Sequence, residues 1–291
     1  MKTIELRDFY KTLSELNNSF THYSFVWSQF NIDYSETLEK NPETLTKDYF
    51  ETNPFKRKHN IKFSELDKEH SKTNESLIKG IFLLIYTHFE SYLKDLFLFA
   101  KTVDNEIQPL ESKIEDVDND FMLIDKTFNR IEVKKEKLQS ELLITLDYIR
   151  LKRNRLIHSN TENISKSLNK LIKSDGKTLN EYWNSKLPSG LQGIDFNNKD
   201  NANELTFSIV IDVINIFRRI SNEIDKVVTE KLTENLIIEK IVIPKFKDVL
   251  RKKINGIKTQ RVISKFVKYC QSEYSLTVND KQIELLKRSI V

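Results

Sequence analysis

The 291-residue sequence predicts an all-α protein. Helix breakers are scarce, with only 5 glycines and 5 prolines, whereas average composition would give about 20 glycines in a chain of this length. Hydrophobic residues make up 38% of the chain, enough to form a sizeable core. Several long segments repeat apolar residues at three- and four-residue steps, which is the spacing of one helix face.

The N-terminal part begins with a predicted helix over residues 4–30, which carries an apolar stripe rich in aromatic residues. Residues 40–72 are polar and contain two prolines, and they predict a long connection with short helical pieces. Residues 74–101 form the strongest predicted helix. Because residues 81–86 are apolar nearly all round, this helix is expected at the centre of a bundle.

The middle of the chain predicts two further long helices. An acidic connection over residues 111–120 leads to a helix over 133–158, followed by a short helix near 161–173. Residues 174–204 hold three of the five glycines and predict a long loop, with a helical turn around Tyr182 and Trp183. Residues 204–230 then form a long amphipathic helix.

The C-terminal part is basic. Residues 236–244 are rich in β-branched side chains and predict a short strand or the end of a helix, and residues 245–291 predict about three short helices. Within residues 245–270, nine lysines and arginines face one acid, Asp248, which permits a polyanionic partner without requiring one.

Three parts are therefore expected: an N-terminal helix and connecting segment (1–74), a helical bundle (75–235) and a basic helical tail (245–291). The single cysteine, Cys270, excludes an intramolecular disulfide and a multi-cysteine metal site. We expect no membrane partner and a cytoplasmic location, because the N-terminus lacks a signal-peptide core and no apolar run approaches the roughly 20 residues that span a bilayer.

The segment "RNRLIHSN" (153–160) is the strongest candidate for chemistry. Arg153 falls in the apolar stripe of its predicted helix, where a buried charge needs a partner. His158 lies five residues later, about 140° further round an α-helix. Arginine and histidine converge if the helix ends at His158 or if a second copy faces the first; otherwise Arg153 pairs with a buried carboxylate such as Glu90.

This segment resembles the signature of HEPN domains, a helical-bundle superfamily whose ribonuclease members, among them RiboL-PSP-like proteins, carry R-x4-6-H, often with asparagine after the arginine. Here the motif is Arg153-Asn154-Arg155-Leu156-Ile157-His158. The segment "YTHFESYLKDLF" (86–97) is similar to the central HEPN helix, whose acidic residue would be Glu90. The resemblance covers about residues 75–230 and implies an up-and-down helical bundle.

The resemblance implies metal-independent cleavage of RNA without a cofactor. Arg153 would bind the phosphate, His158 would exchange protons near its usual pKa of about 6.5, and Asn154 and Glu90 would orient these two groups. The basic residues expected to contact RNA are Arg150, Arg155, Lys252 and Lys253. A homodimer is expected because family active sites form where two motifs meet.

The expected role is that of a toxin or antiviral (abortive-infection) effector, held in check by an antitoxin or a defence-system partner. In HEPN toxins paired with nucleotidyltransferase antitoxins, the motif extends to a modified tyrosine. Asn160 occupies that position here, which excludes adenylylation at this site.

Two other classes of function stay open. One is a non-catalytic HEPN module that binds RNA, a nucleotide or a protein, and the other is a DNA-binding protein that uses the basic tail. Tyr182, Trp183 and Phe196 are candidates for stacking RNA bases, although such aromatics more often anchor loops. His88 is a further candidate, more often a satisfied buried polar group, and Cys270 is interpreted as structural.

Overall fold

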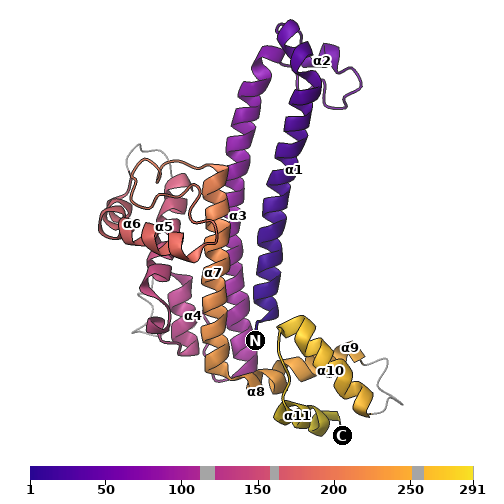
Figure 1. Ribbon diagram of the computed structural model, residues 1–291, viewed down its shortest axis with the longest axis vertical. Helices are drawn as coiled ribbons and strands as arrows, with labels where there is room; N and C mark the ends of the chain where they lie inside the picture. The colour runs from indigo at the N-terminus through magenta and orange to yellow at the C-terminus, as the bar shows by residue number, and fades with distance from the viewer. Residues whose placement is uncertain (112–121, 158–163, 251–258, 291) are drawn as a thin grey trace. The chain divides into compact units, whose positions relative to one another are not determined.

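The computed structural model is all-α, which confirms the predicted fold class (Figure 1). It describes residues 1–111, 122–157, 164–250 and 259–290. In these ranges there is no β-strand, and the one β-pairing is an isolated antiparallel bridge between Leu45 and Lys62. None of the described helices has an apolar stretch long enough to cross a bilayer.

The helices and their bounds, in chain order, are as follows. They are α1 (Ile4–Lys40), α2 (Thr46–Tyr49), the 3-10 turn η1 (Phe63–Glu65), α3 (Leu66–Val103), α4 (Leu123–Ile131), the 3-10 turn η2 (Lys135–Lys137), α5 (Ser140–Ile157), α6 (Lys166–Lys186), α7 (Phe207–Leu232), α8 (Glu234–Ile237), the π-helical turn η3 (Ile238–Val242), α9 (Ile243–Leu250), α10 (Thr259–Tyr274) and α11 (Asp280–Ile290).

The chain folds into two compact units, and neither is continuous in sequence. The first unit comprises residues 1–12, 86–150 and 214–291, and the second comprises residues 13–85 and 151–213. The three-part division expected from the sequence therefore stays a prediction.

The first unit is built on the start of α1 and the later halves of α3 and α7 (Figure 1). The ring centroids of Phe89 and Phe217 lie 4.6 Å apart, and Phe9 stacks on Tyr92 at 5.2 Å. The buried Tyr92 hydroxyl donates a hydrogen bond of 3.1 Å to the carbonyl of Ser221. Aromatic packing and this buried hydrogen bond thus join the three helices within the unit.

The second unit contains a helical hairpin formed by the rest of α1 and the first half of α3, with residues 41–65 at its closed end (Figure 1). Near the start of α7, the rings of Phe20 and Phe207 stack with centroids 3.8 Å apart. The end of α5, all of α6 and the following loop complete this unit.

Several helix bounds differ from the predictions. The first helix continues to Lys40, and α3 begins at Leu66, because polar and charged residues extend both helices beyond their apolar stripes. The helix predicted over residues 133–158 is confirmed in part, because α5 lies within this range but begins later, at Ser140. The chain instead leaves α4 through Glu132 in a left-handed conformation (φ 56°) before α5 begins at Ser140.

The long loop predicted over residues 174–204 was wrong in its first part, since α6 continues to Lys186, and the loop begins only at Leu187. Gly176 was read as a helix breaker, but it lies inside α6 where the backbone of Phe196 approaches closely. A Cβ atom at this position would lie 2.5 Å from the carbonyl oxygen of Phe196. The glycine therefore permits a close backbone contact and does not end the helix.

Residues 236–244 are helical and form no strand. Their β-branched side chains are mostly buried in the turns α8 and η3, including Ile237, Ile238, Ile241 and Val242. A helix that is apolar on most sides is a buried helix, so tertiary burial overrides the β-propensity of these residues.

Candidate functional site

The last turns of α5 carry the described part of the predicted motif. Leu142, Leu146 and Ile149 are buried, as the stripe predicted. Arg153 and Asn154 follow on the same helix and are half-buried. The Nε atom of Arg153 is shielded from solvent, so this guanidinium is not a freely solvated surface group.

Several predicted residues fall outside the described parts of the chain. His158 and Asn160 follow Ile157, the last described residue of α5, and Lys252 and Lys253 follow Leu250. The predicted roles of these residues stay predictions.

Lys152 is a residue of this site that the sequence did not predict. Its side chain is 1% exposed, and its ammonium group donates hydrogen bonds of 2.7 Å to the carbonyl oxygens of Asn201 and Glu204. Burial lowers the pKa of Lys152 to about 7, an effect that the charge of Glu204 partly opposes. The buried face of α5 thus continues through Lys152, whereas the sequence predicted that it continues through Arg153.

The loop that receives Lys152 is itself held by side-chain hydrogen bonds. The buried carboxylate of Asp212 accepts hydrogen bonds from three consecutive backbone N–H groups, those of Gln192, Gly193 and Ile194. Asn201 donates to the carbonyl of Gly193 at 2.9 Å and accepts from the N–H of Asp195 at 3.0 Å. The carbonyl that faces Lys152 therefore belongs to a closed polar network.

Arg155 connects α5 to the same loop, because its Nε donates a hydrogen bond of 3.3 Å to Asn203 Oδ1. Two basic side chains of α5, Lys152 and Arg155, therefore attach the motif-bearing turn to residues 201–204. No regular spacing in the sequence links these positions, since the partners lie about fifty residues apart and two of the three acceptors are backbone carbonyls.

The other predicted site residues belong to the first unit. Glu90 is half-buried on α3. Arg150 forms a salt bridge with Asp147, whose Oδ1 accepts hydrogen bonds of 3.0 Å from Nε and 2.6 Å from Nη2. A phosphate that bound Arg150 would compete with this carboxylate.

Two of the three aromatic residues considered for stacking RNA bases are core residues, in line with the alternative that such aromatics anchor loops. Trp183 and Phe196 have no exposed surface and pack in the core of the second unit. Cys270 is likewise fully buried, and burial raises the pKa of its thiol to about 12. The structural interpretation of this cysteine agrees with its burial.

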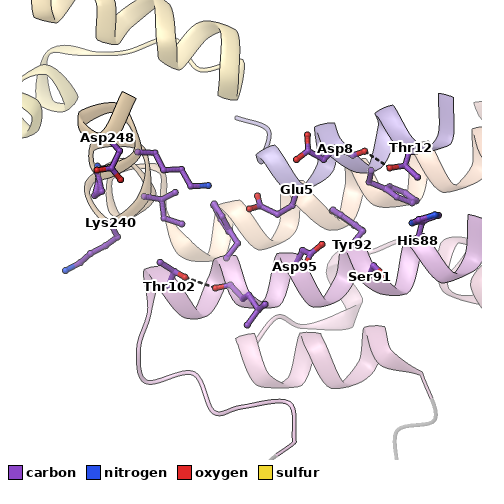
Figure 2. A pocket seen from close by; sticks show the side chains of 16 residues that line it. Glu5, Asp8, Thr12, His88, Ser91, Tyr92, Asp95, Thr102, Lys240 and Asp248 are labelled. Atoms are coloured by element: carbon purple, nitrogen blue, oxygen red, sulfur yellow. Dashed lines mark hydrogen bonds between the residues drawn. The ribbon is translucent and has the colours of Figure 1, made fainter. Parts of the chain in front are cut away.

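His88 lines a cavity of about 630 Å³ in the first unit, between the start of α1, the later half of α3, and η3 with α9 (Figure 2). The carboxylates that line it are Glu5, Asp8, Asp95 and Asp248, and the lysines are Lys240 and Lys245. Acidic groups outnumber basic groups on this lining, so an RNA phosphate would meet net repulsion here.

Glu5 is a half-buried carboxylate of this acidic cavity. Its Oε2 atom is buried and has no hydrogen-bond partner among the residues that the structure describes. Burial raises the pKa of Glu5, the nearby Asp95 and Asp8 raise it further, and Lys245 lowers it. In the residues that the structure describes, no group of three or more histidine, cysteine, aspartate or glutamate side chains is arranged to hold a metal ion.

The fold and these sites define the chain as an all-α protein with a polar, anchored turn on α5. Comparisons with protein-family models, with curated proteins and with solved structures gave no match, so they assign no family.

Proposed function

We propose that the protein is a metal-independent endoribonuclease of HEPN type, acting as a toxin or abortive-infection effector on cellular RNA. The observation that carries this proposal is the setting of the motif. Arg153 and Asn154 lie half-buried at the end of α5, on a turn that Lys152 and Arg155 attach to the loop at 201–204. A catalytic arginine needs such a fixed position to act on a phosphate.

The proposed reaction is attack of a ribose 2′-hydroxyl on the adjacent phosphorus. His158 takes the proton from the 2′-hydroxyl, the 2′-oxygen bonds to phosphorus, and the bond from phosphorus to the 5′-oxygen breaks. The leaving 5′-oxygen receives its proton from His158 of a second copy of the chain. The products are a 2′,3′-cyclic phosphate and a free 5′-hydroxyl, with no oxidant, metal or cofactor in the balance.

The remaining side chains support these two steps. Arg153 offers its planar guanidinium to the phosphate oxygens as their negative charge grows. Asn154 orients the histidine or a phosphate oxygen. A homodimer follows from the need for two histidines, so light scattering at micromolar concentration is expected to give twice the mass of the chain.

The decisive experiment is RNA cleavage in the presence of EDTA, with analysis of the product ends. The wild type is expected to produce 2′,3′-cyclic phosphates. Arg153→Ala and His158→Ala are each expected to lower the rate about 100-fold or more, because positioned proton transfer and charge stabilisation each contribute about that factor.

Matched controls come from exposed positions away from the motif. His22→Ala on α1 and Arg288→Ala on α11 remove the same side-chain types from exposed sites, and both should cleave at the wild-type rate. Induction in bacteria should stop growth and degrade total RNA for the wild type and His22→Ala but not for His158→Ala. Undiminished cleavage by both motif variants would refute the proposal.

A further inference from the structure

The second unit contains a cavity of about 420 Å³ at the closed end of the hairpin formed by α1 and α3. Aromatic rings from three separate segments line it. They are Tyr23, Trp27 and Phe30 of α1, Phe50 and Phe55 of the connecting segment 41–65, and His70 of α3. A volume of a few hundred cubic ångströms with a mostly aromatic lining is typical of sites that bind small planar groups.

The inner wall of this aromatic cavity is preorganised. The rings of Trp27 and His70 stack face to face, with centroids 4.1 Å apart and an interplanar angle of 1°. The Tyr23 hydroxyl forms a hydrogen bond of 3.0 Å with His70 Nδ1. Burial lowers the pKa of His70, so this wall is neutral near pH 7.

The outer wall is open to solvent. Phe55 is 66% exposed although it lines the cavity, so much of its surface is available to a ligand. An exposed aromatic ring at the mouth of an aromatic pocket offers a stacking surface to a planar group that enters.

The chain next to this ring is strongly basic. Phe55 is followed by Lys56, Arg57, Lys58 and His59. Lys56 and His59 line the cavity, and Arg57 and Lys58 are exposed. The one acidic residue on the lining, Glu69, forms a salt bridge of 2.5 Å with Lys72, which reduces its effect on a ligand.

The segment that carries the basic run is fixed to itself by hydrogen bonds. Thr46 donates from its backbone N–H to the carbonyl of Ile61 at 2.9 Å and from its hydroxyl to the carbonyl of His59 at 2.6 Å. The backbone N–H of Phe63 donates to the carbonyl of Thr44 at 3.0 Å. The aromatic ring and its neighbouring cations therefore occupy a closed loop.

Aromatic faces beside a run of positive charges suit one kind of ligand, a chain of planar bases on a polyanionic backbone. A methylated ammonium group would also fit an aromatic cage, but the cations at the rim would repel it. A double helix keeps the faces of its bases inside the stack, whereas an unpaired base can enter a pocket.

We propose that this aromatic cavity binds an unpaired base of a single-stranded RNA, while the basic run Lys56–Lys58 contacts the adjoining phosphates. This inference rests on the proposed function only in that RNA is the substrate. The cavity then serves as a substrate-binding subsite away from the motif on α5.

The test is binding of a fluorescein-labelled, 2′-O-methylated 12-nucleotide adenosine RNA to the full chain, measured by anisotropy. This RNA lacks the attacking hydroxyl, so binding is measured without cleavage. Phe55→Ala should weaken binding about 5- to 100-fold, the loss expected when one base loses its stacking partner. Phe55→Tyr, which keeps a ring, should bind within about threefold of the wild type.

Phe25 provides a matched control, because it is 65% exposed on α1 but does not line the cavity. Phe25→Ala should bind as the wild type does. Equal affinities of Phe55→Ala and Phe25→Ala would overturn the proposal. So would equal binding of an abasic strand of the same length, or binding of adenosine monophosphate as tight as that of the 12-mer.

The basic run is tested by the salt dependence of binding. Arg57→Gln combined with Lys58→Gln should reduce the slope of log affinity against log salt by up to about 1.4, or about 0.7 for each lost phosphate contact with a single strand. The exposed pair Lys170→Gln and Lys173→Gln on α6 should leave the slope unchanged, and an equal reduction in both double variants would contradict the assignment.

The two proposals fail separately. If the 12-mer depends on Phe55 but the wild type does not cleave RNA, the cavity stands and the nuclease proposal falls. If cleavage depends on Arg153 and His158 but binding of the 12-mer is unchanged in Phe55→Ala, the nuclease proposal stands and the cavity proposal falls.

Discussion

Each unit contains a buried charged side chain, and the two are stabilised in opposite ways. In the second unit, Lys152 donates to the carbonyls of Asn201 and Glu204. In the first unit, Asp225 accepts hydrogen bonds from the backbone N–H and the hydroxyl of Thr3. The lysine attaches the motif-bearing helix to a loop, and the aspartate attaches the start of the chain to α7.

Burial shifts the two pKa values toward neutrality from opposite sides. The pKa of Lys152 falls to about 7, so the unfolded chain binds more protons than the folded chain between about pH 7 and 10, and stability rises with pH in that window. The pKa of Asp225 rises to about 6. The contribution of protonated Asp225 to the free energy of unfolding is therefore fully present below about pH 4 and is lost as the pH rises through 6. Burial thus disfavours the charged form of both side chains, and the stability of the two units depends on pH in opposite directions.

The largest effect is expected for Lys152→Ala. This change removes a fully buried side chain and the donor to two carbonyl groups, so the free energy of unfolding should fall by about 2–4 kcal/mol. Urea denaturation at pH 7.5 measures this value. Because the end of α5 loses its attachment, RNA cleavage should fall as well, under conditions in which the variant is folded.

Two further variants separate packing from charge at this position. Lys173→Ala, on an exposed face of α6, should change stability by less than about 0.5 kcal/mol. Lys152→Met keeps most of the buried volume but cannot titrate, so it should lack the rise in stability between about pH 7 and 8.5. If the stability of Lys152→Met rises by the same amount over this pH range, the titrating group is not Lys152.

The helices that the sequence predicted well are those whose buried residues recur at three- and four-residue steps. Ile81, Ile85, Phe89 and Leu96 of α3 recur at helical spacing, and all four are buried. Lys152 could not be predicted in this way, because its partners are backbone carbonyls of a distant loop and carry no side-chain signature. The loop predicted around Gly176 was wrong for a related reason, since the close approach of the Phe196 backbone to this glycine is a tertiary contact.

The aromatic cavity could not be predicted from the sequence for a different reason. Its rings come from two helices and from a segment that the sequence marked only as a polar connection, and no spacing along the chain relates Trp27 to Phe55 or His70. The loop aromatics that drew attention, Trp183 and Phe196, are buried instead. Residue type alone does not separate a ring that packs in a core from a ring that faces a cavity.

An intermediate effect is expected for Asp225→Asn, seen as a change in pH dependence. Raising the pKa from 3.8 to about 6 implies that ionised Asp225 costs up to about 3 kcal/mol at neutral pH. Between pH 4 and 7, the wild type should therefore lose stability relative to Asp225→Asn by about 1–3 kcal/mol. Denaturation of both proteins across this range measures the difference, and a difference that is constant with pH would exclude titration of Asp225 as the cause.

The smallest effect on stability is expected for Arg155→Ala, which tests whether this residue contacts RNA or only holds the loop. Its hydrogen bond to Asn203 is 3.3 Å long and exposed, so its loss should cost less than about 1 kcal/mol. Asn203→Ala removes the same hydrogen bond from the other side and keeps the guanidinium. If Arg155 binds RNA, Arg155→Ala should raise the KM for RNA several-fold with little change in kcat, and Asn203→Ala should leave KM near the wild-type value. Equal changes in KM for the two variants would mean that Arg155 acts through the loop and not through the substrate.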